Sequence, residues 1–139
     1  MNNIHYKTSV DGIAASMLIG FFEDWPNPPD SGTHLRILKG SSHIVLALPQ
    51  SDEKVVGYVT AISDGVTCAY IPQLEVLPEY RGQGIGSELV KRMIKQLNGI
   101  YAIDLLCDED VNPFYERLGM QQANGMFIRN YQNQAGLPV

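Results

Sequence analysis

The chain has 139 residues, of which 45% are hydrophobic and 18% are charged. This length is typical of one domain with its own core, and the composition excludes an intrinsically disordered chain. The formal net charge is −5, from ten basic and fifteen acidic residues without a basic block. This balance excludes a typical nucleic-acid-binding surface and favours a cationic small molecule as a partner.

The sequence also argues against a membrane-spanning protein and against a metal-binding protein. No apolar run approaches the roughly 20 residues that cross a bilayer, and the N-terminal residues are too polar for a signal peptide. We therefore expect a cytoplasmic protein without a membrane partner. The two cysteines, Cys68 and Cys107, stand in apolar runs and are expected to be buried thiols, and the scattered histidines predict no metal site.

The N-terminal part predicts a strand and two helices. Residues 3–9 fit a short strand, and residues 12–22 fit a helix. Three prolines between residues 26 and 29 prevent this helix from continuing, so a rigid loop is expected there. Ser31 can then cap a second helix over residues 33–40.

From residue 43 onward the pattern changes to that of strands. Residues 43–49 and 55–63 are rich in apolar and β-branched side chains and predict a hairpin. An Asp-Gly turn signal follows, and residues 66–76 predict a third strand of the same antiparallel meander. Pro72 interrupts this strand, and a central strand tolerates proline only at a bulge or where pairing stops.

A glycine-rich segment, residues 81–86, leads into an amphipathic helix. The apolar face of this helix is formed by Leu89, Val90, Met93, Ile94 and Leu97. Gly99 ends the helix, and residues 101–107 predict a short buried strand.

The C-terminal part predicts a short helix and a hairpin. Asn112 and Pro113 are typical of a helix start, and this helix is expected to run to residue 118. Residues 120–131 predict a hairpin around an Asn-Gly pair, the strongest two-residue turn signal. Residues 131–139 are expected to be a loose tail.

The glycine-rich segment indicates an anion-binding site. Its glycines expose backbone N–H groups at the positive end of a helix dipole, where no Cβ atom obstructs a ligand such as pyrophosphate. A P-loop is excluded because no Lys follows the glycines. A dinucleotide-binding fold is excluded because the glycines follow an antiparallel meander rather than the first strand of a repeating β/α chain. The alternative to an anion-binding site is an ordinary tight turn, which also requires glycines.

Two motifs resemble those of the GNAT superfamily of acyl-CoA-dependent N-acetyltransferases. Arg81, Gly84 and Gly86 match its Gln/Arg-x-x-Gly-x-Gly/Ala hallmark, within a segment LEVLPEYRGQGIGSELV that looks like the family's phosphate-binding segment. NPFYERLGM, residues 112–120, looks like the family's later helix with its tyrosine. The resemblance covers residues 1–139. It implies one mixed α/β domain, with a mostly antiparallel, splayed sheet flanked by about four helices.

The resemblance implies acetyl-CoA as the co-substrate and no metal. The backbone from Leu74 to Val76 would pair with the pantetheine arm, and the Val76 N–H would stabilise the oxyanion. Pro72 would help to splay this strand from residues 101–107, which opens the cofactor site. The implied cofactor-binding residues are Leu74, Glu75, Val76, Arg81, Gly82, Gln83, Gly84, Ile85, Gly86 and Ser87.

The resemblance also implies catalytic residues. Tyr115 would donate a proton to the CoA thiolate, although it could instead only pack beside Phe114. Family members often have a Glu or His four or six residues before the position of Val76, where this chain has Pro72 and Tyr70. We therefore expect a water held near Tyr70 to act as the general base. The alternatives are Glu75, Asp104 and Asp108.

The acceptor site is expected between the first two helices and the final hairpin. Phe21, Phe22 and Trp25 fall there and would suit a small aromatic or arylalkyl primary amine, although they could equally cap the core. The ammonium group could be held by Asp24, Asp30 or Asp64. The alternative acceptor is a protein or peptide amino group, and the alternative function is non-catalytic acyl-CoA binding. The terminal hairpin could pair two copies into a homodimer.

Overall fold

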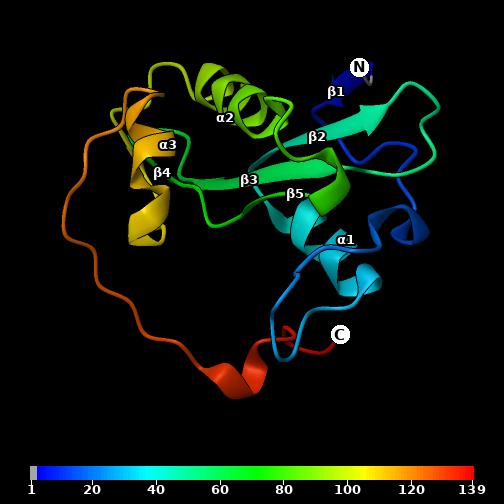
Figure 1. Cartoon of the computed structure of the whole chain (residues 1–139). Helices are drawn as coiled ribbons and strands as arrows, with labels where there is room; N and C mark the ends of the chain where they lie inside the picture. The colour runs from blue at the N-terminus through cyan, green and yellow to red at the C-terminus, as the bar shows by residue number, and fades with distance from the viewer. Residues whose placement is uncertain (1–2) are drawn as a thin grey trace.

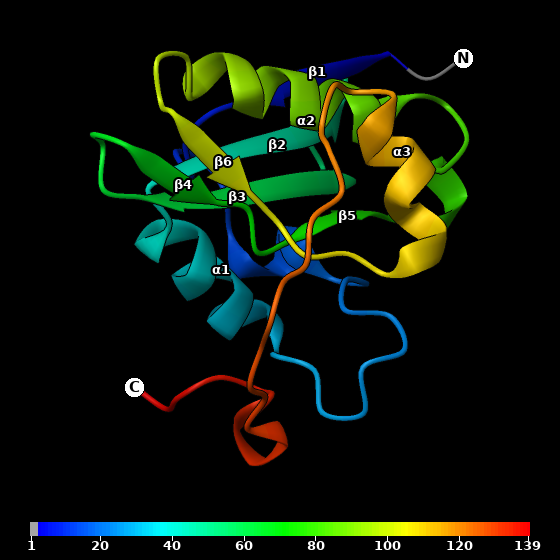
Figure 2. The same cartoon turned by 90° about the vertical axis from the view of Figure 1, so that its left-hand side faces the viewer.

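The computed structural model describes residues 3–139 and contains a six-stranded sheet. The strands are β1 (Ile4–Lys7), β2 (His43–Pro49), β3 (Gly57–Ser63), β4 (Cys68–Tyr70), β5 (Leu74–Val76) and β6 (Ala102–Asp104). Their order is β1-β2-β3-β4-β6, and β5 pairs with β3 (Figures 1 and 2). All pairs are antiparallel except β4 with β6, which are parallel. The expected mixed α/β fold with a mostly antiparallel sheet is confirmed.

Helices cover both faces of this sheet. They are α1 (Ser31–Gly40), α2 (Ile85–Gln96) and α3 (Asn112–Glu116). Figures 1 and 2 show α1 on one face and α2 on the other. The cap of α1 is Asp30, whose carboxylate accepts the Thr33 N–H at 2.7 Å, rather than Ser31 as expected. No helix within residues 3–139 is both long and apolar enough to span a membrane.

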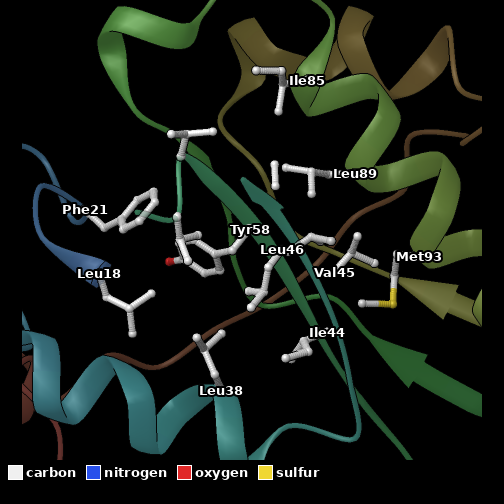
Figure 3. Close-up of a cluster of buried hydrophobic side chains, with 14 of the residues drawn as sticks. Leu18, Phe21, Leu38, Ile44, Val45, Leu46, Tyr58, Ile85, Leu89 and Met93 are labelled. Carbon is white, nitrogen blue, oxygen red and sulfur yellow. The ribbon is translucent and has the colours of Figure 1, made fainter. Parts of the chain in front are cut away.

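The core fills the space between the sheet and each helix layer (Figure 3). Because successive side chains of a strand point to opposite faces, Val45 packs toward Met93 of α2 while Leu46 packs toward Leu38 of α1. Val45, Leu46 and Met93 are fully buried. Each large apolar side chain buried in this way stabilises the fold by about 1.5–3 kcal/mol. The apolar runs of β2 and β3 thus place the sheet in the centre.

The third strand of the meander is broken at Pro72, as predicted. Tyr70 lies opposite Ile62, whereas Leu74 lies opposite Val59. Three residues between Tyr70 and Leu74 therefore oppose two residues between Val59 and Ile62, which is a β-bulge. After the bulge β5 follows β3, while β6 stays with β4. The bulge thus separates β5 from β6 and produces the expected splay.

The prediction of a helix over residues 12–22 is wrong. The structure has a single 3₁₀ turn there, Ala15–Leu18. Gly12 and Gly20, on either side of this turn, have φ angles of 77° and 103°, which a right-handed helix cannot contain. Three α-helices, rather than about four, therefore flank the sheet within residues 3–139.

The short helix expected in the C-terminal part is confirmed as α3, but the other two expectations for this part are wrong. Residues 120–130 form no strand, so the predicted hairpin is absent. The tail is attached rather than loose: Gln134 Oε1 accepts the Asn27 N–H at 2.7 Å, and Arg36 Nη2 donates to the Leu137 carbonyl at 2.8 Å. The chain end therefore docks on the loop before α1 and on α1 itself (Figure 2).

The two cysteines are exposed, not buried as expected. Cys68 alternates along β4 with buried Ala69, so its side chain points to the opposite, uncovered face. Cys107 follows the end of β6, which is shorter than the strand expected over residues 101–107.

Candidate active site

One edge of β5 is available for pairing with a ligand. The Leu77 N–H donates to the Val56 carbonyl at 2.9 Å, so Leu77 faces β3. Backbone groups alternate in direction along a strand, which makes Glu75 face β3 as well. The N–H and C=O groups of Leu74 and Val76 therefore point away from β3. Within residues 3–139, β5 has no strand partner on that side.

The glycine-rich segment forms an open cradle at the start of α2. Gly82 and Gly84 have φ angles of 77° and 83°, and no atom lies within 4 Å of the position that a Cβ would take at either residue. Gly84 is the N-cap of α2 and provides no side-chain cap, so the first N–H groups of the helix are free of a capping side chain. The helix dipole adds positive partial charge here. This arrangement fits a pyrophosphate group.

A cavity of about 590 Å³ joins the β5 edge to the glycine cradle and to α3. It is lined by Leu74, Glu75, Val76, Tyr80, Arg81, Gly82, Gly84, Ile85, Gly86, Ser87, Val111, Phe114 and Tyr115. The structure thus brings together every cofactor-binding residue expected from the sequence except Gln83. Tyr80, Val111 and Phe114 were missed, although the aromatic pair beside the expected proton donor was a usable signal.

Tyr115 reaches this cavity from α3. Its ring packs edge-on against Phe114, with the ring centroids 4.9 Å apart. Burial, with a smaller contribution from Cys107, raises the pKa of Tyr115 to about 12. The phenol therefore keeps its proton throughout the physiological pH range and can act as an acid.

Comparison with known proteins agrees with this geometry. The model of the acetyltransferase (GNAT) family matches residues 12–120. The chain belongs to the GNAT family. The crystal structure of a putative acetyltransferase from Deinococcus radiodurans R1 is 47% identical to this chain and superposes with a TM-score of 0.95 over 100% of both chains.

Curated relatives of this GNAT chain are more distant. It is 38% identical over 74 residues to GCN5-related N-acetyltransferase 2, chloroplastic, of Arabidopsis thaliana, which covers 52% of this chain and 29% of the relative. It is 31% identical over 109 residues to histone acetyltransferase TAP1 of Glycine max, which covers 70% of this chain and 46% of the relative. The chain thus spans less than half the length of these two relatives.

Arg81 of the GNAT hallmark connects three parts of the site. Its Nε donates to the Val76 carbonyl at 2.9 Å, and its Nη2 donates to Glu23 Oε2 at 3.1 Å. The side chain lines the cavity beside the glycine cradle. The guanidinium therefore places positive charge where the cradle and the open edge of β5 meet, and it ties residue 23 of the N-terminal loop to this position.

Glu75 holds the same loop from the other side. Its Oε1 accepts the Phe22 N–H at 2.8 Å and its Oε2 accepts the Glu23 N–H at 3.4 Å. Burial raises the pKa of this half-buried carboxyl above its ordinary value of 4.5. Phe22 and Asp24 have positive φ angles of 63° and 69°, so the carboxylate stabilises a strained turn. From the sequence, Glu75 was expected to pair with the cofactor through its backbone, and its side chain was an alternative general base, but this contact with the N-terminal loop was not predicted.

The expected acceptor residues do not form one open rim. Phe21 and Phe22 are buried in the core, whereas Trp25 is exposed and packs on Phe22 with the ring centroids 4.9 Å apart. Phe21 and Phe22 also line a second cavity of about 160 Å³ next to α1, together with His34. The two phenylalanines thus both cap the core and bound a small space.

His34 is the buried centre of this aromatic cluster. Its side chain is 1% exposed, and neither ring nitrogen has a hydrogen-bond partner. Phe21, Phe22 and Tyr58 surround the ring, with centroids between 4.5 and 5.4 Å away. Burial lowers the pKa of His34 from 6.5 to about 4.

We expect His34 to make the fold sensitive to acid. The unfolded chain binds a proton at His34 below pH 6.5, and the folded chain binds it only near pH 4. The free energy of unfolding should therefore fall by up to about 3 kcal/mol as the pH is lowered through this interval. Urea denaturation of the wild type and His34→Phe at pH 7 and pH 4.5 measures this effect. An equal loss in both proteins would show that other groups cause the acid sensitivity.

Tyr70 lies outside the cavity. It is on β4, opposite Ile62, whereas Val76 lies opposite Gly57, so the bulge puts the two side chains on opposite faces of the sheet. The expected water near Tyr70 therefore does not adjoin the β5 edge. Two expected ammonium partners also have structural roles, because Asp30 caps α1 and Asp64 accepts backbone N–H groups of the β3–β4 turn.

Proposed function

We propose that this protein transfers an acetyl group from acetyl-CoA directly to a primary amine. The observation that supports this most strongly is the single cavity that contains the open edge of β5, the glycine cradle and Tyr115. The cradle fits pyrophosphate, the N–H groups of Leu74 and Val76 and the Leu74 carbonyl suit the amides of a pantetheine arm, and the phenol suits a leaving thiolate. The residues therefore meet each requirement of thioester chemistry.

The proposed reaction is a direct attack. The amine nitrogen forms a bond to the thioester carbonyl carbon, and the negative charge that develops on oxygen is stabilised by the Val76 N–H. The C–S bond then breaks, and the sulfur takes the Tyr115 proton. The nitrogen loses one proton to a base, and the phenolate is reprotonated by solvent before the next turnover. The products are an N-acetylated amine and CoA.

We assign the base to Glu75 in place of a water near Tyr70. Glu75 is one of the residues that line the cavity, and burial raises the pKa of its carboxyl group, which makes the ionised form a stronger proton acceptor. Phe22 is bonded to the same carboxylate, which places the aromatic loop next to the proposed base. Glu75 would then both position the acceptor loop and accept the amine proton.

We expect Glu75→Gln to lower kcat about tenfold while CoA affinity stays unchanged, because the amide can still accept the Phe22 N–H but cannot accept a proton. The matched control is Glu79→Gln, which changes an exposed carboxylate outside the cavity. With an arylamine that is already neutral, the wild-type rate should fall at acidic pH and the Glu75→Gln rate should not. Identical pH profiles would remove Glu75 as the base.

For the acceptor we propose a small aromatic or arylalkyl amine. Trp25 is exposed beside Phe22 and can stack on an aromatic ring, and the net charge of −5 attracts a cationic amine. We place the protein in the cytoplasm, since its exposed free cysteines are typical of a reducing compartment. The proposed direct transfer requires no metal ion.

Release of free thiol from acetyl-CoA tests this function. The panel should contain arylalkyl amines, aliphatic polyamines and a lysine-containing peptide. We expect turnover with the arylalkyl amines. Turnover with the peptide alone would assign a protein acceptor, and tight CoA binding without turnover of any amine would identify a binding domain.

A further inference from the structure

The N-terminal loop, residues 20–25, has a backbone conformation that its contacts must maintain. Phe22 and Asp24 have positive φ angles of 63° and 69°, which are unfavourable for residues with a side chain. The loop would therefore relax if its contacts were lost. One of these contacts is the bond from Arg81 Nη2 to Glu23 Oε2. The conformation of the loop thus depends in part on a cation that belongs to the cofactor cavity.

The ion pair between Arg81 and Glu23 can be broken at little cost. The two side chains are 52% and 44% exposed, and their charged atoms are 3.1 Å apart. Ion pairs at this exposure contribute little to stability, because water and salt screen them. The Arg81 Nε atom also donates to the Val76 carbonyl at 2.9 Å, which holds the guanidinium at the cavity without Glu23. Arg81 can therefore exchange the partner of its terminal nitrogens while it stays in place.

Arg81 is also the cation that a phosphate of the cofactor would pair with. Among the described residues that line the cofactor cavity, it is the only Lys or Arg, and it stands beside Gly82 and Gly84 of the cradle. A pyrophosphate in the cradle would gain charge-assisted hydrogen bonds from this guanidinium. The Glu23 carboxylate is an anion on the same group, so the two anions repel each other. The occupation of Arg81 by one of them therefore weakens the binding of the other.

We propose that Glu23 is a positioning residue that competes with the pyrophosphate of CoA for the Arg81 guanidinium. In the free protein, the Glu23 carboxylate orients the guanidinium and holds the N-terminal loop. When CoA binds, phosphate oxygens replace the carboxylate, and the loop is released at residue 23. This competition rests on the proposed function, since it requires CoA to bind in the cradle.

The N-terminal loop extends this effect beyond the cofactor cavity. Phe22, next to Glu23, lines the second cavity of about 160 Å³ and packs on Trp25 with the ring centroids 4.9 Å apart. A change at residue 23 is therefore adjacent to the region that we propose for the acceptor amine. CoA binding would loosen one wall of that region.

Calorimetric titration with CoA tests the competition. We expect Glu23→Gln to bind CoA about three- to fivefold more tightly than the wild type, because the amide does not hold the guanidinium by charge. The matched control is Glu79→Gln, which removes an equally exposed carboxylate two residues before Arg81, one that pairs with Lys54 at 3.7 Å. Its Kd should stay within about 1.5-fold of the wild-type value.

The outcomes of this titration separate the competition from the proposed function. Unchanged or weaker CoA binding by Glu23→Gln would overturn the competition, and so would equal tightening in Glu79→Gln. In both cases the wild type still binds CoA, and the proposed function stands. A wild type that does not bind CoA would contradict the proposed function and the competition together.

A double-mutant cycle with Arg81→Gln distinguishes competition from simple repulsion. Without the guanidinium there is no shared partner, so adding Glu23→Gln to Arg81→Gln should leave the Kd for CoA within about 1.5-fold. If the full tightening persists in the absence of Arg81, Glu23 acts only by repelling the phosphates. The proposed competition would then be wrong.

The fluorescence of Trp25, the single tryptophan of the chain, reports on the loop. We expect CoA to move the wild-type emission maximum to longer wavelength, because the indole leaves Phe22 and meets more water. Glu23→Gln should emit at the longer wavelength before CoA is added, and Glu79→Gln should behave like the wild type. A wild-type maximum that stays fixed at a CoA concentration shown by calorimetry to be saturating would contradict the release of the loop.

Discussion

Tyr115→Phe should lower kcat by about a hundredfold or more and leave CoA affinity unchanged, because the phenol is needed only when the thiolate leaves. The ring still packs edge-on against Phe114 without its hydroxyl, so the cavity keeps its shape. Transient and steady-state thiol release, with CoA binding by calorimetry, measures the two quantities separately. The change in kcat shows whether Tyr115 donates a proton to the thiolate or only packs against Phe114.

The matched control for this substitution is Tyr101→Phe, which removes a hydroxyl from a fully exposed tyrosine. Because the pKa of Tyr115 is about 12, the wild-type rate should also show no loss of this acid up to about pH 10. Equal turnover of Tyr115→Phe and wild type would return Tyr115 to a packing role. A fall in activity near pH 8 that disappears in Tyr115→Phe would contradict the pKa.

Gly84→Val should weaken CoA binding about a hundredfold, because a branched side chain would fill the cradle and displace the charge-assisted bonds to the backbone. The chain offers a matched control in Gly65→Val. Gly65 also has a positive φ, 75° against 83° at Gly84, and also has no atom near its Cβ position, but it lies in the β3–β4 turn.

Both glycine substitutions should lower the free energy of unfolding by a similar amount, on the order of 1–2 kcal/mol, because a side chain disfavours the left-handed region. Only Gly84→Val should change the Kd for CoA. If Gly65→Val weakens binding equally, the loss comes from strain in the fold. If neither does, the cradle is not the pyrophosphate site.

Local signals in the sequence were sufficient for the parts that build the cofactor cavity. Each of these signals involves only a few residues: the apolar and β-branched runs of β2 and β3, the proline in the third strand, and the glycines before α2. Pro72 predicted a break, and the structure shows the bulge that separates β5 from β6. The cradle could be predicted because its geometry depends on glycine and on one helix start.

The side of the sheet on which Tyr70 lies could not be predicted. A bulge moves the side chains on one side of it to the opposite face of the sheet relative to those on the other side. An even separation of six residues from Val76 suggests the same side of a regular strand. One extra residue reverses that relation, and sequence shows that a bulge is tolerated but not how many residues it contains.

Contacts between distant parts of the chain explain the other errors. Glu75 binds Phe22 across 53 residues, and no local pattern indicates such a bond. The Asn-Gly pair predicted a hairpin from turn preference alone, yet a hairpin needs a neighbouring strand to stabilise it, and residues 120–130 leave their own sheet. The helix expected over residues 12–22 failed for a local reason, because Gly12 and Gly20 adopt positive φ angles that end any helix there.

The most direct test of the cofactor site is a titration of the ¹⁵N-labelled protein with CoA, followed by amide NMR. We predict large shifts for the amides of Val76 and of Gly84 to Ser87, which face the cavity. The Glu75 amide, directed toward β3, should shift much less. Saturable shifts confined to this set would support CoA binding along β5 and the start of α2. Binding that leaves Val76 and the α2 amides unchanged would contradict it.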